Sequence, residues 1–380
     1  MIAQPDENGS MKHLRTLKGY RPLTFIPDGI LLAKGYDLFA ANLDCSCLNR
    51  VGTVPHALAS GSLRRLRILE RILRLGIRFG CCIDEGSYLL AERNRLWLLE
   101  LPSGAVSLDH LIENGTKPLG ISRIQGVKGF EDGACYGEYW NNSTKEAVNI
   151  WVRSREGAWR VAHTFPRGTI EHVHGIVPYE LRGIVWIVTG DSGDAAGIWA
   201  ARNNFSEVLP VLVGKQDFRC CWLAFSDGEI IYATDSPLAV NSVRKLILPE
   251  GYSQVRDPWI GARSEPFMEI SGSSIYSCRL QNQVVFSTTV EPGLLTGKKM
   301  RDWLDRRPGP GIKGLYSDLM IGTQAGFALV GRWAKDPWPM RLCEFGSISF
   351  PTGINPGRSL YAYFTGLAQR DGSMSVFEID

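Results

Sequence analysis

Four carboxylates occur at matching places, each at or just after the end of a β-branched or aromatic run. They are Glu138 in GEYW, Asp191 in TGD, Asp235 in TDSP and Glu291 in TVEP. Like charges held close together separate the proton affinities of the two groups, which suits general acid–base chemistry. We predict all four as catalytic residues, with Glu138 and Asp191 first. Asp235 alone is also explained as a turn former, whereas Glu138 lies in an aromatic run and has no turn role.

A second group of polar residues lies just before these runs. His172 and His174 in EHVHG are two residues apart, so both imidazoles lie on one face of a strand. Arg219 in QDFR has the planar fork that clamps a carboxylate or phosphate. The predicted substrate-binding residues are Tyr139, His172, His174, Gln216 and Arg219. No cofactor is predicted; the alternative is a divalent metal ion bound by His172 and His174 with Asp191 or Gln216.

A repeated unit of sequence supplies the elements that would position these side chains. In each copy a short apolar strand and a turn precede a β-branched or aromatic strand, and a further strand follows. The middle strands are 30–34, 87–91, 134–138, 185–189, 230–234, 284–288 and 360–364. Short strands at this spacing with Gly, Asn and Asp turns are typical of β-propeller blades. We therefore predict an all-β fold, a propeller of seven blades, with six as the alternative.

The ends of the chain predict how the propeller closes. The last copy has only three strands, and residues 11–17 (MKHLRTL) supply the fourth. Pairing of the two ends removes an exposed sheet edge. The innermost strands would line a tunnel, at whose mouth the predicted site residues meet. Residues 1–380 are thus predicted to form one propeller domain.

One segment breaks the repeat. Residues 63–79 (LRRLRILERILRLGIRF) place leucines at helical spacing among arginines, which predicts a basic amphipathic helix inserted between blades 1 and 2. Such a helix binds an anionic membrane surface or a protein partner, or it lies in solvent with its leucines covering the propeller. Its last residues are expected to begin the next strand.

Composition limits the classes of partner and compartment. The net charge of +3 is too weak to predict nucleic-acid binding. No apolar run reaches the roughly 18 residues of a membrane span, and no signal peptide is recognised. The nine cysteines do not follow zinc-binding spacings and read as buried thiols. The expected location is the cytoplasm.

The segment around residues 150–159 (IWVRSREGAW) resembles a degraded Asp box, with Glu156 in place of the Asp. The order GEY, HVHG, TGD, QxFR, TDSP and STTVEP resembles uncharacterised bacterial and archaeal sialidase-like (BNR-repeat) propellers. The resemblance implies a propeller. True sialidases would further imply an arginine triad, a Tyr/Glu nucleophile pair and an Asp acid. Arg219 matches one arginine, and Glu138 with Tyr139 suggests the nucleophile pair.

These observations predict a carbohydrate-active enzyme, a sialidase-like glycoside hydrolase that acts on an acidic or complex glycan. Two alternatives remain open. One is a metal-assisted polysaccharide lyase that uses His172 and His174. The other is a non-catalytic propeller that serves as a scaffold or glycan-binding protein in polysaccharide biosynthesis, because propellers host many unrelated functions.

Overall fold

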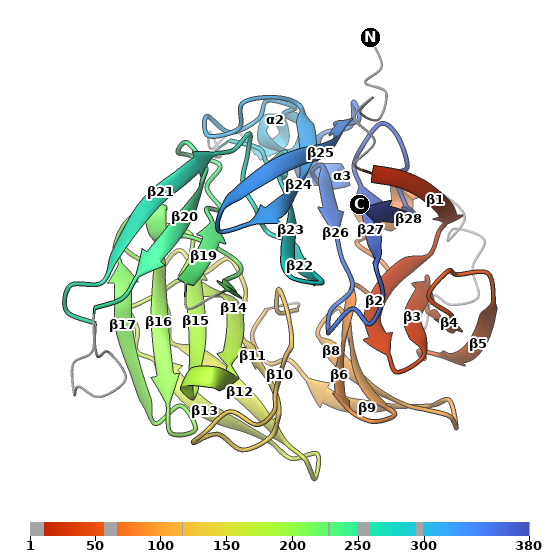
Figure 1. Cartoon of the computed structure of the whole chain (residues 1–380), viewed down its shortest axis with the longest axis horizontal. Coiled ribbons are helices and arrows are strands. Elements are labelled where there is room, and N and C mark those ends of the chain that lie inside the picture. The colour runs from red at the N-terminus through yellow and green to blue at the C-terminus, as the bar shows by residue number, and fades with distance from the viewer. Residues whose placement is uncertain are drawn as a thin grey trace. The chain divides into compact units, whose positions relative to one another are not determined.

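The structure is a computed structural model that describes residues 11–56, 67–115, 117–226, 229–249, 259–293 and 299–379. Within these residues the strands form seven four-stranded antiparallel sheets, and the fold is a β-propeller (Figure 1). We number the sheets as blades 1 to 7 in chain order. The prediction of an all-β propeller with seven blades is confirmed.

The chain divides into two compact units, each of which is described by itself. Unit 2 comprises His110–Ser236 and Asn241–Ile270, and unit 1 comprises the rest. The division passes within one strand, β9 (Ala105–Leu111), and unit 1 contains blades 1, 2, 6 and 7. The prediction that residues 1–380 form one domain stays a prediction.

Unit 1 builds its blades from consecutive strands, except for one strand of blade 7. Blade 1 contains β2 (Arg21–Ile26), β3 (Gly29–Lys34), β4 (Asp37–Ala41) and β5 (Leu48–Thr53), and blade 2 contains β6 (Phe79–Asp84), β7 (Ser87–Glu92), β8 (Arg95–Glu100) and β9. Blade 6 contains β22 (Ser277–Leu280), β23 (Gln283–Ser287), β24 (Tyr316–Thr323) and β25 (Gly326–Ala334), and blade 7 contains β26 (Ser347–Ser349), β27 (Ser359–Thr365), β28 (Ser373–Ile379) and β1 (Met11–Lys18).

Unit 2 holds the three middle blades, again with four consecutive strands each. Blade 3 contains β10 (Ser122–Ile124), β11 (Gly133–Gly137), β12 (Val148–Ser154) and β13 (Trp159–Phe165), and blade 4 contains β14 (His172–Tyr179), β15 (Ile184–Gly190), β16 (Gly197–Arg202) and β17 (Glu207–Val213). Blade 5 contains β18 (Ala224–Ser226), β19 (Glu229–Ala233), β20 (Ser242–Ile247) and β21 (Arg263–Glu269).

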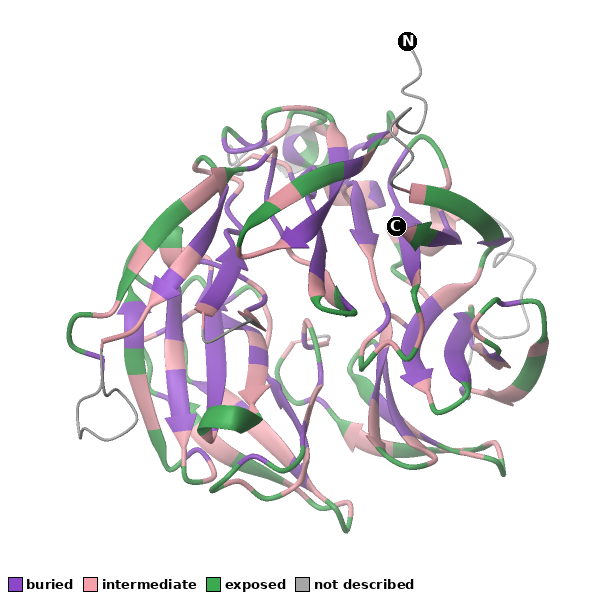
Figure 2. Cartoon of the chain, viewed as in Figure 1, coloured by how far each residue is buried: buried purple, intermediate pink, exposed green. Residues whose placement is uncertain are grey.

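Burial follows the order of strands within a blade. All seven residues of β15, a second strand, are buried, whereas β21, a fourth strand, has no buried residue (Figure 2). Within unit 2, blades 3 and 4 bury apolar side chains against each other: Ile150 on β12 and Ile187 on β15 belong to one hydrophobic cluster. Second strands therefore need apolar residues on both faces, which is the continuous pattern that identified them in the sequence.

Strand β1 completes blade 7 by pairing antiparallel with β28, from Met11 opposite Ile379 to Lys18 opposite Ser373. The predicted closure by an N-terminal strand is confirmed. The pairing covers the outer edge of β28, which would otherwise present unpaired backbone groups.

The inserted helix ends earlier than predicted. Residues 63–66 lie outside the described residues, helix α1 spans Arg67–Ile72, and Phe79 already begins β6, as expected. Arg74 and Gly76 have positive φ angles of 51° and 83°, which end the helix.

The arginines of this segment are not all on a solvent face, which corrects the sequence-based picture. Arg71 is 2% exposed, pairs with Asp336 and lies 3.6 Å from Asp371. Arg67 pairs with Asp371 at 3.0 Å, and Arg78 pairs with Glu344 at 2.7 Å. These side chains hold the segment to unit 1. Docking to a membrane or partner through residues 63–79 stays a prediction.

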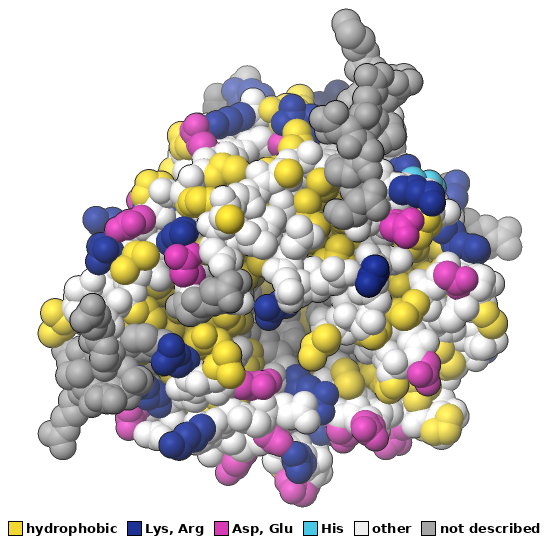
Figure 3. Space-filling model, viewed as in Figure 1, with side chains coloured by type: hydrophobic (Ala, Val, Ile, Leu, Met, Phe, Trp, Pro, Cys, Tyr) yellow, Lys and Arg dark blue, Asp and Glu magenta, His cyan; other side chains and the backbone are white. Residues whose placement is uncertain are grey.

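The remaining helical turns are short: α2 (Lys299–Leu304), α3 (Met340–Cys343), η2 (Glu180–Arg182) and η3 (Gln216–Phe218). Among the described residues, no helix is both long enough and apolar enough to cross a lipid bilayer. Basic and acidic side chains are interspersed on the face shown in Figure 3, in keeping with the small net charge.

Candidate functional site

The predicted site residues of unit 2 converge because they occupy equivalent strand ends. In each blade the first strand begins where the second strand ends: His172 at the start of β14 is paired with Gly190 at the end of β15. Cys220, just before β18, pairs in the same way with Thr234, just after β19. Residues that precede a first strand or follow a second strand therefore lie at one edge of their blade.

The two histidines of β14 point to the same place. Their rings are 5.0 Å apart between centroids, and Nε2 of His172 lies 3.1 Å from Nε2 of His174. Both residues are 3% exposed. Gly190 makes room for them, because a Cβ at that position would lie 2.2 Å from Cε1 of His174.

Backbone carbonyls fix the orientation of both rings. Nδ1 of His172 lies 2.8 Å from the carbonyl oxygen of Trp140, and Nδ1 of His174 lies 3.1 Å from that of Cys220. A carbonyl oxygen only accepts hydrogen bonds, so each Nδ1 carries the proton and donates. In the neutral rings, both Nε2 atoms then present lone pairs toward each other.

Asp191 brings a third electron-rich atom to the same point. Its Oδ1 lies 3.1 Å from Nε2 of His174 and 3.5 Å from Nε2 of His172. Burial by itself would raise the pKa of Asp191, but hydrogen bonds donated by Nε2–H of His172 and His174 when these rings are protonated, together with the charge of Arg219, hold it well below its usual value. The carboxylate is therefore ionised. Its side chain is 42% exposed, so the cluster is open to solvent on this side.

Gln216 and Arg219 hold the Asp191 segment in position. Nε2 of Gln216 donates to the carbonyl oxygen of Asp191 at 2.8 Å, and Nη1 of Arg219 donates to the same oxygen at 3.2 Å. Nη2 of Arg219 lies 2.7 Å from Oδ1 of Asp191. On the far side of the loop, the Glu171 carboxylate accepts the backbone N–H groups of Asp191 and Ser192 at 3.4 and 3.3 Å.

Asp235 belongs to the cluster but is enclosed by it. Its side chain is 4% exposed, and Oδ2 lies 3.5 Å from Nη2 of Arg219 and 3.7 Å from Nδ1 of His174. The thiol of Cys221 donates to Oδ2 at 3.3 Å. Burial first, then the charge of Asp235, raises the pKa of Cys221 well above its usual value, so Cys221 is a neutral thiol. Asp235 contacts the groups that hold the site and does not face solvent.

The prediction that Glu138 is catalytic does not fit its surroundings. Its carboxylate is 1% exposed and accepts hydrogen bonds from the backbone N–H of Asn149 at 2.8 Å, from the Asn114 side chain at 3.0 Å and from Trp151 Nε1 at 3.2 Å. These donors hold it inside blade 3. These contacts give Glu138 a structural role, and we exclude it from the reacting groups.

Tyr139 turns the opposite way from Glu138, as neighbouring residues of an extended chain do. Its ring centroid lies 4.3 Å from that of His172 and 6.2 Å from that of His174. Tyr139 is half-buried and forms one wall of the cluster.

Glu291 belongs to unit 1, whereas the cluster belongs to unit 2. It follows β23 in unit 1, is 9% exposed, and its carbonyl oxygen accepts the backbone N–H of Gly309 at 2.9 Å. Of the four predicted catalytic carboxylates, unit 2 thus gathers Asp191 and Asp235 at the histidines.

Two residues of the cluster were not predicted. Cys221 directly follows Cys220 in sequence, and adjacent residues of an extended chain point to opposite faces. This alternation places Cys221 on the side of His174. Glu171 directly precedes His172, and this position in the sequence is the signal that could have placed it near the cluster.

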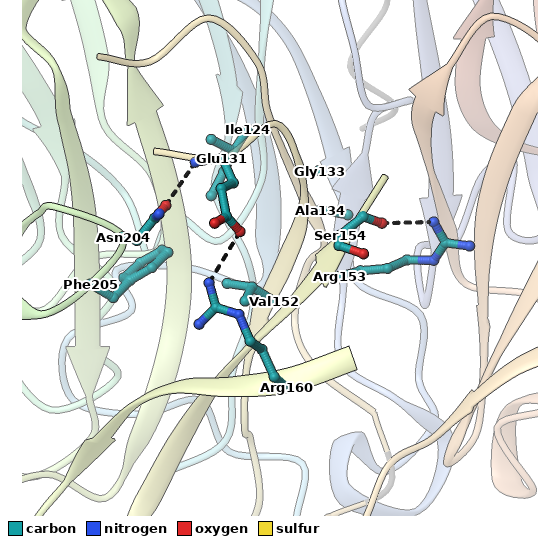
Figure 4. Close-up of a pocket in the computed structure, with 10 residues that line it drawn as sticks. All are labelled: Ile124, Glu131, Gly133, Ala134, Val152, Arg153, Ser154, Arg160, Asn204 and Phe205. Atoms are coloured by element: carbon teal, nitrogen blue, oxygen red, sulfur yellow. Dashed lines mark hydrogen bonds and ion pairs between the residues drawn. The ribbon is translucent and has the colours of Figure 1, made fainter. Parts of the chain in front are cut away.

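A separate small pocket in unit 2 does not overlap the cluster. It is lined by residues of blade 3 and by Asn204 and Phe205 of blade 4 (Figure 4). Its charged groups are already paired: Arg160 contacts Glu131 at 3.3 Å, and the Glu131 backbone N–H donates to Asn204 at 2.7 Å. This pocket offers no reactive combination of side chains.

The cluster at the histidines fits a metal ion. Ligand atoms about 2.1 Å from a shared ion lie about 3.0 to 3.4 Å from one another at octahedral or tetrahedral angles. Nε2 of His172, Nε2 of His174 and Oδ1 of Asp191 are 3.1 to 3.5 Å apart. Two lone pairs and a carboxylate oxygen repel one another unless a cation or a proton lies among them. Imidazole and carboxylate donors suit Zn²⁺, Mn²⁺ and related divalent ions.

Comparison with known proteins identifies the fold alone. No protein-family model matches the chain, and no curated protein matches its sequence. An oligogalacturonate lyase in complex with manganese is 11% identical with a TM-score of 0.58, over 100% of this chain and 95% of that one. A chain of the mitotic checkpoint complex is 9% identical with a TM-score of 0.56 (100% and 96%), and the AfRom2 CNH domain is 10% identical with a TM-score of 0.53 (97% and 99%).

Proposed function

We propose that His172, His174 and Asp191 bind a divalent metal ion and that the protein is a metal-dependent polysaccharide lyase acting on an acidic glycan. The observation that carries the proposal is the convergence of two Nε2 lone pairs and one ionised carboxylate oxygen within 3.5 Å of one another. The similarity in fold to an oligogalacturonate lyase in complex with manganese is in keeping with it.

The chain's own residues would do three things at this centre. The carbonyl-bound Nδ1 atoms of both histidines orient the Nε2 atoms, and Arg219 with Gln216 fixes Asp191. The exposed side of Asp191 and the half-buried ring of Tyr139 are where a sugar would approach. A bound divalent ion would supply Lewis acidity that neutralises a sugar carboxylate and makes the adjacent C–H bond more acidic.

The disposition of the carboxylates favours a lyase over the glycoside hydrolase expected from the sequence. A glycoside hydrolase of the usual kind needs two carboxyl groups on either side of the scissile bond. Asp191 is exposed, but Asp235 is enclosed beside Arg219, and Glu138 is occupied by donors of blade 3. A sialidase-like site would also need three arginines, and the described residues of the cluster include one, Arg219.

Metal analysis of the purified protein tests the first half of the proposal. We expect about one equivalent of a divalent ion, or uptake of Mn²⁺ or Zn²⁺ by protein stripped with a chelator. The double variant H172A/H174A should lose this binding. The matched control is H163A, because His163 lies on β13 against Phe165. Equal metal binding by H172A/H174A and the wild type would contradict the proposed centre.

Product analysis tests the second half. Metal-loaded protein is incubated with polygalacturonate and other uronate polymers, and formation of an unsaturated uronate is followed by absorbance. Elimination that disappears on chelation and returns with Mn²⁺ is expected. Release of a saturated reducing end would favour hydrolysis instead. Metal binding without cleavage of any uronate polymer would contradict the lyase assignment but would not contradict the metal centre.

A further inference from the structure

Two arginines of unit 1 lie at the beginnings of two strands that contact each other. β2 and β6, the first strands of blades 1 and 2, contact each other, and a Cβ at Gly80 would lie 3.3 Å from Cβ of Leu23. Arg21 is two residues before Leu23, and Arg78 is two residues before Gly80. Arg21 is the first residue of β2, Arg78 directly precedes β6, and the charge of Arg21 acts on Arg78.

Arg21 is held by an aromatic ring rather than by an acid. Its guanidinium carbon lies 4.0 Å from the ring centroid of Tyr363 on β27. Among the described residues it forms no ion pair, and it is half-buried. Stacking on the ring face leaves the N–H groups at the guanidinium edge directed outward, where they can bind an anion in a bidentate manner.

Arg78 is buried with part of its hydrogen-bonding capacity unused. Its side chain is 9% exposed and has one ion pair, 2.7 Å from Oε1 of Glu344. Nε of Arg78 is buried and has no hydrogen-bond partner among the described residues. Burial lowers the pKa of Arg78, Glu344 raises it, and nearby Arg21 lowers it again. A buried N–H group without a partner is costly, which favours a ligand that accepts from it.

The surrounding charges leave a positive excess. Arg67 and Arg71 are engaged by Glu70, Asp336 and Asp371, and Lys335 pairs with Asp336. Glu344 is the one carboxylate paired with Arg78, and Arg21 adds a second cation beside it. Counting these residues, five cations face four carboxylates.

We infer that Arg21, Arg78 and Tyr363 form a binding site for an oxyanion, which is a carboxylate, sulfate or phosphate group of a small ligand. The two guanidinium groups supply the N–H donors, and the Tyr363 ring orients one of them. The site lies wholly in unit 1 and does not rest on the function proposed for the histidine centre of unit 2.

Calorimetric titration with inorganic phosphate, sulfate and galacturonate tests the site. The wild type should bind at least one of the three, and R21M should bind it at least ten-fold more weakly. The affinity of R21K, which keeps the positive charge but lacks the planar guanidinium group, should lie between those of the wild type and R21M. R95M is the control, because Arg95 is exposed on β8. Preference for galacturonate would assign the site to acidic sugars, and preference for phosphate or sulfate would assign it to tetrahedral anions.

The outcomes separate this site from the histidine centre and from a folding defect. H172A/H174A should bind the anion as the wild type does. R78M is a second variant, checked by circular dichroism, because it removes the ion pair between Arg78 and Glu344. Anion binding by R21M equal to that of the wild type, or binding of none of the three probes by the wild type at millimolar concentrations, would overturn the inference.

Discussion

Glu138 and Tyr139 are neighbours in sequence, yet Glu138 stabilises blade 3 and Tyr139 lies at the histidine cluster. Glu138 accepts hydrogen bonds from Asn149 and Trp151 of blade 3 and from Asn114, while Tyr139 contacts His172. The alternation of an extended chain is enough to separate the two roles. A residue type that suggests chemistry therefore has to be read together with the face on which it lies.

Replacing Glu138 should consequently affect stability and leave metal binding unchanged. E138Q places an amide N–H₂ against groups that are themselves donors, so the free energy of unfolding should fall by about 1 to 3 kcal/mol. Urea denaturation and metal analysis measure the two effects. E156Q, at an exposed turn, should change the stability by less than about 0.5 kcal/mol. If E138Q were as stable as the wild type but lost metal binding, Glu138 would instead be part of the metal site.

At the scale of elements, the described part of helix α1 is held by the buried ion pair of Arg71 with Asp336. Arg71 pairs with Asp336 and donates to the carbonyl oxygen of Cys343 at 2.5 Å. Helix α1 is therefore joined at one guanidinium group to a segment 265 to 272 residues later in the chain. Removing a single partner of a buried pair leaves the other charge uncompensated.

R71M should lower the free energy of unfolding by about 3 to 5 kcal/mol, because Asp336 would lose its buried partner. R74M is the matched control: Arg74 is exposed beyond the end of the helix and should be neutral to substitution. Thermal and urea unfolding of both variants measure the difference. Similar stabilities would mean that α1 is not anchored through Arg71.

The sequence predicted the second strand of every blade because each blade repeats one pattern. All seven second strands, including β11 and β27, lie within a residue or two of their expected positions. β24 was not predicted, since a long connection that contains α2 separates it from β23 and hides the repeat. The helix was predicted to end too late because leucine spacing carries no information about the positive φ angles of Arg74 and Gly76.

The candidate site was predictable where spacing alone brings side chains together. The i, i+2 spacing of His172 and His174 placed both rings on one face, and strand ends placed Asp191 beside them. The pairing of Glu138 with donors of β12 and the enclosure of Asp235 depend on side-chain contacts across strands. Periodicity does not report such contacts.

At the scale of the whole molecule, the closing strand β1 is the partner of β28 in an antiparallel pair. Met11 lies opposite Ile379, so the two strands are placed as the arms of a hairpin. A circular permutant that joins residue 379 to residue 11 through a short Gly-containing turn, and begins at Tyr20, would keep every strand pair of blade 7.

This permutant should be folded, with an unfolding free energy within about 1 to 2 kcal/mol of that of the parent. Denaturation and size-exclusion chromatography measure it. The contrasting variant lacks residues 11–18, exposes the edge of β28 and should aggregate. A truncated chain as stable and as soluble as the parent would contradict a closing role for β1.

The β1–β28 pair also sets an order of events during synthesis. Thr16 contacts Ser375 across a sequence separation of 359 residues. A ribosome that has made β1 must therefore translate nearly all the remaining strands before that partner exists. Until then β1 lacks its partner β28, which makes the growing polypeptide a substrate for chaperones that bind extended segments.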